Sequence, residues 1–179
     1  RPFDERDQGA ALDLLHALLR HRARLGWWLE RQASPDTPRN RMVAWLALAQ
    51  GLTADQMKQL FTGAKALSEA ELALVRRLRG SGIDHPDMTE DLRLECPDWA
   101  VGPLRQRFGA AFATEMAATL SPAPLDLRVN PMKSSRAAVL RGLKDLGLRA
   151  EATKLAPQGI RIRERLSLAR LPGLKTGEI

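Results

Sequence analysis

The chain has 179 residues, with 28 Lys and Arg against 21 Asp and Glu, a net charge of +7 and a mean hydropathy of −0.29. Its longest apolar run, Met42–Ala49, is far shorter than the ~20 residues that a membrane-spanning helix needs, and its one cysteine excludes an internal disulfide. The composition therefore predicts a soluble, cytoplasmic protein with no membrane partner, long enough for one large domain or two small ones.

The first predicted helix is apolar on two sides. Two groups of residues lie on nearly opposite sides of its helical wheel: Leu12, Leu15, Leu19 and Gly26, and Leu14, Leu18, Leu25 and Trp28. A helix of this kind is usually sandwiched between others. Trp27, Trp28 and Trp45 stand at helical spacing among leucines, which favours a place in the core over base stacking.

Local signals mark the next helices. Pro38 begins a helix that Gly51 ends. The segments TADQ from Thr53 and SEAE from Ser68 are typical of capping boxes, for helices that end at Leu60 and Leu78. Further helical patterns over 97–108 and 110–120 bring the expected total to roughly six helices.

A domain boundary is predicted at Leu120–Pro124, where two prolines interrupt the helical pattern. Residues 1–121 carry 16 Lys and Arg against 16 Asp and Glu, whereas residues 122–179 carry 12 against 5, a net charge of +7. We therefore expect an α+β chain, with a helical domain over 1–121 and a small α/β domain over 122–179. The concentration of charge indicates a polyanionic partner for the second domain.

The second domain opens with a strand, a turn and a helix. In the segment LDLRVN over 125–130, apolar residues alternate with Asp126, Arg128 and Asn130, as in a strand with one buried face. Pro131 ends this strand, Ser134 or Ser135 caps the next helix, and Gly147 suits its C-terminal end.

Two more strands complete a βαββ unit. The first is expected near Ala150–Leu155, and the second contains Ile160 and Ile162 after a turn at Pro157–Gly159. The outward-facing side chains of this unit include four candidate cations: Arg128, Arg161, Arg163 and Arg165.

Arg128, Asn130, Lys133 and Arg136 form the strongest candidate RNA-binding group, because phosphates need cationic donors and a turn adds free N–H groups. Two alternatives stay open: Arg128 pairs with Asp126 or Glu151, and Asn130 has only a structural role in the turn. No aromatic residue lies on the strand faces, so contacts to RNA backbone and shape are expected rather than base stacking.

Arg20 and Arg24 lie with Asp13 and Arg31 on a polar stripe of the first helix, and they are weaker candidates for RNA contact. A solvated face paired with acidic residues and an interface with another domain are equally open, because the net charge of the helical domain is zero.

Catalytic and metal sites are not expected in this chain. Cys96 lies in the helical region and precedes a proline, which favours a plain, partly buried thiol. The three histidines and Cys96 lack metal-ligand spacing, and the acidic residues over 84–95 are typical of solvated helix faces.

Several phrases together resemble the non-catalytic N-terminal region of the Sun (Fmu) family, bacterial ribosomal RNA cytosine-5 methyltransferases. These phrases are CPDWAVGPLRQRFGAAFATEMAATLSPAPLDLRVN from Cys96, LDLRVNPMKSSRAAVLRGLKDLG from Leu125, APQGIRI from Ala156 and LARLPGLKTGEI from Leu168. The segment LLRHRARLGWWLERQ resembles the family's helical domain, which is similar to the antitermination factor NusB.

The resemblance implies that this chain positions ribosomal RNA of the small subunit for a catalytic domain of the same protein that lies beyond Ile179. That domain would bind S-adenosylmethionine and carry two catalytic cysteines, so the resemblance implies no catalytic or cofactor-binding residue here. It also implies that a chain beginning at Arg1 is an excised fragment. Two other readings stay open: a NusB-like protein-interaction module without RNA contact, and a free-standing antitermination-like factor.

Overall fold

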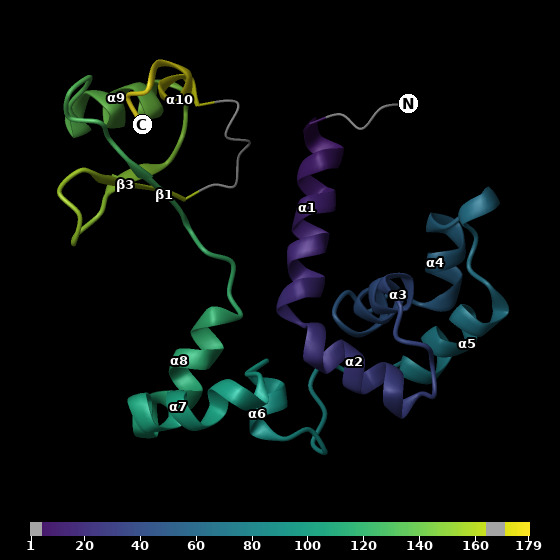
Figure 1. The fold of residues 1–179 in the computed structure, drawn as a ribbon. Helices are drawn as coiled ribbons and strands as arrows, with labels where there is room; N and C mark the ends of the chain where they lie inside the picture. The colour runs from purple at the N-terminus through teal and green to yellow at the C-terminus, as the bar shows by residue number, and fades with distance from the viewer. Residues whose placement is uncertain (1–4, 164–170) are drawn as a thin grey trace. The chain divides into compact units, whose positions relative to one another are not determined.

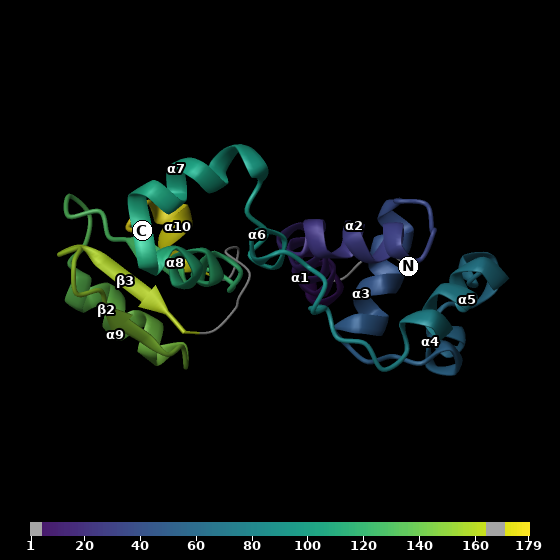
Figure 2. The same ribbon diagram turned by 90° about the horizontal axis from the view of Figure 1, so that it is seen from below.

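The computed structural model describes residues 5–163 and 171–179, which form helices and one three-stranded antiparallel sheet (Figures 1 and 2). The fold class is therefore α+β, as predicted. The elements are α1 (Glu5–Arg20), α2 (Arg22–Arg31), α3 (Pro38–Leu48), α4 (Ala54–Leu60), η1 (Gly63–Lys65), α5 (Glu69–Leu78), α6 (Glu90–Arg93), α7 (Asp98–Phe108), η2 (Gly109–Ala111), α8 (Phe112–Thr119), β1 (Leu125–Arg128), α9 (Arg136–Asp145), β2 (Ala150–Ala152), β3 (Gly159–Ile162) and α10 (Pro172–Thr176).

The described residues separate into two compact units. One, which we call the helical unit, comprises residues 12–121, and the other, the sheet unit, comprises residues 122–179 together with the described residues before Leu12. One break between the two units lies at 121/122, and the other lies within α1. No helix in the described part of the chain has both the length and the apolar character needed to cross a bilayer.

The helical unit has its main core between α2, α3 and α5. Helix α3 packs against both of the others, and Leu25, Leu29, Val43 and Leu78 are fully buried there. The predicted role of the tryptophans is confirmed, because Trp28 is buried and Trp27 and Trp45 pack against the same core. A separate small cluster around Cys96, Ala100 and Phe112 joins α7 to α8.

Both predicted capping boxes are present. The hydroxyl of Thr53 accepts a hydrogen bond from the amide of Gln56, whose side chain accepts one from the amide of Thr53. Ser68 and Glu71 make the same reciprocal pair at the start of α5. Each box satisfies two of the backbone N–H groups that a helix start leaves without partners.

The first predicted helix is in fact two helices, α1 and α2, which meet at His21. The apolar pattern predicted that this helix is buried on two opposite sides. On α1, the side that carries Leu12, Leu15 and Leu19 is about half exposed (48–59 %), so the prediction is wrong for this side. The apolar contacts concentrate on α2 instead, where Leu25 and Trp28 enter the core.

The start of α2 is held by a carboxylate that is distant in sequence. Glu95 accepts hydrogen bonds from the amides of Ala23 and Arg24, at 2.6 and 3.0 Å. The Arg24 side chain adds an ion pair to Glu95 (Nε–Oε1 3.1 Å) and another to Asp84 (Nη1–Oδ1 2.6 Å). Glu95 itself adopts a left-handed backbone conformation with φ of +53°, an uncommon conformation for a residue with a Cβ. A carboxylate at a helix N-terminus satisfies free N–H groups and interacts favourably with the helix dipole.

Arg24 therefore has a structural role. Its side chain is only 6 % exposed and is bound to Glu95 and Asp84. The prediction that it lies on an outward stripe is wrong, because helical periodicity gives the side on which a residue lies but not which distant segment covers that side. We do not retain Arg24 as a candidate RNA contact.

The sheet unit has the predicted βαββ arrangement. Strand β3 is central and pairs antiparallel with both β1 and β2, which gives the order β1-β3-β2. Helix α9 packs against one face of the sheet through contacts with β2 and β3 (Figure 2). Their shared core contains Val129, Leu143, Ile160 and Ile162, and Ser135 caps α9 through the amide of Ala138.

Strand β2 is shorter than predicted and ends at Ala152. The amide of Thr153 donates to the carbonyl of Gly159, and the Thr153 hydroxyl donates to the carbonyl of Ala156. The chain therefore turns immediately after β2. Leu155, which was expected in a strand, is 99 % exposed in this turn.

The environment of His21 makes stability depend on pH. Its ring stacks on Trp45 with centroids 4.7 Å apart, and Nδ1 lies 2.5 Å from Nη2 of Arg24. Burial, reinforced by the charges of Arg24 and Arg20, lowers the pKa of His21 from 6.5 to about 4. The folded state therefore holds the neutral ring at pH values where the unfolded chain takes up a proton.

Replacing Arg24 should destabilise the helical unit. We expect Arg24→Met to lower the free energy of unfolding by about 3 kcal/mol, because it leaves the carboxylate of Glu95 without its buried partner. The control is Arg22→Met, at an exposed position of the same helix, which should change stability by at most about 0.5 kcal/mol. Urea denaturation measures both, and equal effects would contradict the assigned role.

Lowering the pH from 6.5 to 4 should reduce the free energy of unfolding through His21 by on the order of 2 kcal/mol, because protonation favours the unfolded chain. This loss should be absent above pH 6.5. His21→Gln keeps a hydrogen-bond acceptor but cannot titrate, so its unfolding free energy should fall less over the same interval. Urea titrations at several pH values test this, and identical slopes for the two proteins would refute it.

Candidate nucleic-acid interface

The outer face of the sheet, opposite α9, carries a row of alternating charges. The register places Asp126 of β1 and Glu151 of β2 on either side of Arg161 in the central strand. Arg163 lies two residues beyond Arg161, on the same face. Cross-strand neighbours with opposite charges attract each other, so the register itself pairs these side chains.

Two predicted cations are occupied by these pairs. Arg161 binds Asp126 through two parallel hydrogen bonds, Nε–Oδ1 of 2.7 Å and Nη2–Oδ2 of 2.8 Å, which lower the pKa of Asp126. Arg163 lies 2.6 Å from a carboxylate oxygen of Glu151. All four side chains are substantially exposed, so solvent screens the pairs. Arg161 and Arg163 face outward as predicted, but each is largely neutralised.

Arg128 differs from these two arginines. It is exposed, and among the described residues it makes no hydrogen bond or ion pair. The open alternative that it pairs with Asp126 or Glu151 is wrong, because both acids are bound by other arginines. Arg128 lies opposite Gly159, a residue with no side chain, so the neighbouring position on the central strand offers it no partner.

A groove of about 1260 Å³ runs between Arg128 and the β2–β3 turn. Lys154 and Leu155 line it from the turn, and Lys154, like Arg128, has no hydrogen-bond or ion-pair partner among the described residues. The lining also includes the paired residues Asp126, Glu151, Arg161 and Arg163. The two unpaired cations are therefore the groups of this groove that are free to bind an anion.

Gly159 allows the turn to close beside the groove. A Cβ at this position would lie 2.2 Å from Oγ1 of Thr153 and 3.0 Å from the Cβ of Ala156. The amide of Gly159 also donates to the carbonyl of Ala156. Only a residue without a side chain fits at this close approach.

Asn130 is a structural residue, as its alternative interpretation held. Its Nδ2 donates to the carbonyl of Gly177, its Oδ1 accepts from the amide of Met132, and its own amide donates to the carbonyl of Glu178 at 2.7 Å. Its carbonyl accepts from the amides of Lys133 and Ser134. This residue joins the end of β1 to the following turn and to the C-terminal segment, and both ends of its side-chain amide take part in the junction.

Two other predicted cations are partly engaged with backbone carbonyls. Nζ of Lys133 donates to the carbonyl of Thr176 at 2.6 Å, at the end of α10. Nη1 of Arg136 lies 3.4 Å from the carbonyl of Ala156, a long contact. A carbonyl does not neutralise a cation, so both side chains still contribute positive potential. Arg165, also predicted to face outward, lies outside the described residues.

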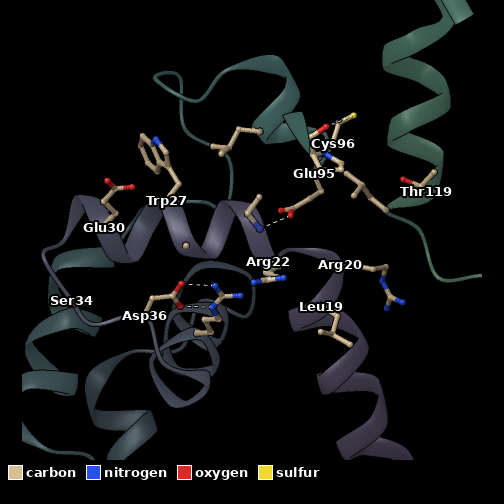
Figure 3. Close-up of a pocket in the computed structure, with 16 residues that line it drawn as sticks. Leu19, Arg20, Arg22, Trp27, Glu30, Ser34, Asp36, Glu95, Cys96 and Thr119 are labelled. Atoms are coloured by element: carbon tan, nitrogen blue, oxygen red, sulfur yellow. Dashed lines mark hydrogen bonds and ion pairs between the residues drawn. The ribbon is translucent and has the colours of Figure 1, made fainter. Parts of the chain in front are cut away.

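Arg20 lines a second pocket, of about 980 Å³, in the helical unit (Figure 3). Arg22 lies on the same lining, and Glu95 points toward the first turn of α2 in this view. Arg41 also contributes, but it is bound to Asp36. Arg20 thus remains half-buried and without an ion pair among the described residues, and whether it contacts RNA stays a prediction.

Cys96 also lines this second pocket, and the residue is only 7 % exposed. Burial raises the pKa of its thiol, so the reactive thiolate is disfavoured. Within the described ranges, no three His, Cys, Asp or Glu side chains gather as a metal site.

Sequence reasoning missed Lys154. The sequence predicted a strand over 150–155, which placed Lys154 within a strand. In the structure β2 ends at Ala152, and Lys154 lies in the turn that follows. Pro157 and Gly159 are typical turn residues, and they are the feature of the sequence that could have placed Lys154 in a turn.

Comparison with known proteins bears on this sheet unit. The family model described as Methyltr_RsmF/B-like, ferredoxin-like domain matches residues 96–169. Residues 96–169 are thus similar to the ferredoxin-like domain of RsmF/B-like methyltransferases. This confirms the resemblance seen in the sequence, and the antiparallel βαββ unit over 125–162 lies inside the matched range.

Two curated proteins are similar to the chain. A probable ribosomal RNA small subunit methyltransferase B of Synechocystis sp. is 27 % identical over 98 % of the chain and 45 % of its own length. A ribosomal RNA small subunit methyltransferase B of Xylella fastidiosa is 30 % identical over 46 % of the chain and 20 % of its own length. The chain spans less than half the length of either relative.

Replacing Gly159 should distort the rim of the groove. We expect Gly159→Ala to lower the free energy of unfolding of the sheet unit by about 2 kcal/mol, because the added Cβ forces apart a hydrogen-bonded turn. Gly142→Ala is the control: it lies on α9 with no atom near its Cβ position, and alanine there should be neutral or stabilising by up to about 1 kcal/mol. Thermal denaturation of the two variants checks the difference, and equal stability would contradict the close approach.

Proposed function

We propose that this chain is the RNA-positioning region of an S-adenosylmethionine-dependent ribosomal RNA cytosine-5 methyltransferase, and that the groove beside Arg128 and Lys154 binds RNA backbone. The observation that carries the proposal is the presence of two exposed cations without acidic partners in this groove. The family match and the printed names of the two relatives, both small-subunit rRNA methyltransferases, support the substrate.

The charge distribution supports the same location. Residues 122–179 hold the whole net charge of +7, and this segment contains no aromatic residue. Recognition by stacked bases is therefore not available to this part of the chain, whereas contact with phosphates is. Binding of this kind is weakly sequence-specific and strongly dependent on salt.

The proposed contribution to catalysis is positional. Holding the RNA so that a target base reaches a catalytic pocket lowers the entropic part of the barrier. The described residues do not suit S-adenosylmethionine, because β1 is followed by Pro131 and enters α9 through a serine cap rather than through a glycine-rich loop. We therefore assign the cofactor and the methyl transfer to a catalytic domain of the same protein, as the family resemblance implies, and no step of that reaction to these residues.

The other features of the proposal follow from the resemblance. The helical unit corresponds to the NusB-like domain, the RNA belongs to the small ribosomal subunit, and the protein acts in the cytoplasm. The domain limits of 1–121 and 122–179 also remain part of the proposal, since the matched family range begins at residue 96, within the helical unit.

A protein-interaction role without RNA contact is the second candidate. Five large apolar side chains among the described residues of the helical unit are about half exposed or more: Leu12, Leu15, Leu19, Leu60 and Trp99. Exposed apolar side chains grouped along a helix are typical of surfaces that contact another protein. Measuring RNA affinity after removal of the two groove cations distinguishes this role from RNA binding.

Removing the two unpaired cations should weaken RNA binding. We expect Arg128→Ala with Lys154→Ala to reduce the affinity for a small-subunit rRNA fragment by on the order of tenfold. The slope of log K against log salt should decrease by about 1 to 2, as expected for the loss of two phosphate contacts. Filter binding or fluorescence anisotropy over a series of salt concentrations measures both quantities.

The matched control is Arg141→Ala with Lys144→Ala. It removes the same charge from exposed positions of α9 in the same unit. If net charge alone governs binding, the two double variants lose affinity equally, and the groove is not the site. If neither variant changes the affinity, RNA binding lies elsewhere and the protein-interaction role gains support.

A further inference from the structure

The turn between β2 and β3 is closed by its own hydrogen bonds and projects from the sheet (Figure 1). The amide of Thr153 donates to the carbonyl of Gly159 at 3.0 Å. The carbonyl of Ala156 accepts from the Thr153 hydroxyl and from the Gly159 amide, each at 2.9 Å. The tip of the turn, formed by Lys154 and Leu155, is therefore shaped before any ligand binds.

Leu155 gives this tip an apolar surface. The residue is 99 % exposed, and it lines the groove together with Lys154 and Arg128. A single exposed leucine is ordinary on a protein surface. At this place, however, it lies in the same groove as two cations that have no partner among the described residues. Such a combination suits a ligand that offers phosphates and apolar edges side by side.

The sheet unit does not suit single-stranded RNA. Proteins bind unpaired nucleotides by stacking the bases on aromatic side chains, and residues 122–179 contain no aromatic residue. The arginines on the outer face of β3 are bound to Asp126 and Glu151. A duplex needs no stacking platform, because its bases are already stacked on one another and its phosphates and sugar edges face outward.

Gln158 adds a group that recognises RNA sugars. It lines the groove, and its side-chain amide has no hydrogen-bond partner among the described residues. Its backbone carbonyl is already bonded to the amide of Val129, which fixes the position of the residue. A primary amide both donates and accepts hydrogen bonds, as does a ribose 2′-hydroxyl. The wide, shallow minor groove of an RNA duplex displays these hydroxyls.

We propose that the groove binds double-stranded RNA, with the tip of the β2–β3 turn in the minor groove of the duplex. Arg128 and Lys154 contact phosphates, Leu155 covers sugar edges, and Gln158 bonds to a 2′-hydroxyl. This inference rests on the proposed function, which it narrows from RNA backbone in general to a duplex.

A DNA duplex separates shape from charge. It also carries two dense rows of phosphates, so a purely electrostatic site binds it well. Its minor groove is only about 6 Å wide and has no 2′-hydroxyl. A turn that carries Lys154 and Leu155 therefore fits the RNA duplex and not the DNA duplex.

Fluorescence anisotropy with the 179-residue chain tests the proposal. The probes are a short RNA duplex, one of its single strands and a DNA duplex of the same sequence, all at the same salt concentration. We expect the RNA duplex to bind about fivefold more tightly than either of the other probes. Leu155→Ala should weaken binding of the RNA duplex by about threefold and leave the other two affinities unchanged.

The control variant is Leu146→Ala, at another exposed leucine of the sheet unit (56 %), just after α9. It should change none of the three affinities. Equal binding of the RNA duplex and the single strand would overturn the proposal, as would equal binding of the RNA and DNA duplexes. A Leu155→Ala variant that binds the RNA duplex as tightly as the unaltered chain would also overturn it.

These outcomes are distinct from a failure of RNA binding itself. If Arg128→Ala with Lys154→Ala weakens single-strand and duplex binding alike, and no duplex preference exists, the groove binds RNA backbone and only the duplex inference fails. If neither RNA probe binds the unaltered chain, both proposals fail.

Discussion

The cross-strand register of opposite charges on the sheet determines which cations of this protein are available to a ligand. Arg161 stands between two acidic residues on neighbouring strands and binds Asp126 with both arms of its guanidinium. Glu151 is then taken by Arg163. Because both acids of the sheet face are occupied, and because Arg128 faces a glycine on the central strand, Arg128 keeps a full, uncompensated charge at the groove.

The Asn130 junction connects this site to the rest of the sheet unit. One side chain and one peptide unit hold the end of β1, the turn before α9 and the C-terminal segment together. This arrangement fixes the position of Arg128, two residues earlier, without using any charged group. It also places the carbonyl of Glu178 against the edge of β1.

Local features were readable from the sequence, and long-range partners were not. Both capping boxes, the βαββ order and the end of β1 at Pro131 follow from patterns within a few residues. Arg24 was misplaced because its partners lie 60 and 71 residues away. Lys154 was missed because a tertiary turn, closed by Gly159, shortens β2. Alternation predicted that Arg161 and Arg163 face outward, but only the register identifies the acids that pair with them.

The central claim is that Arg128 and Lys154, rather than the paired arginines, contact RNA. Side-chain NMR during titration with a small-subunit rRNA fragment tests it most directly, through the Nε–Hε signals of the arginines and the Nζ signals of the lysines. The account predicts that the signals of Arg128 and Lys154 shift, while those of Arg161 and Arg163 keep their positions. Shifts confined to Arg161 and Arg163, or to arginines of the helical unit, would contradict it.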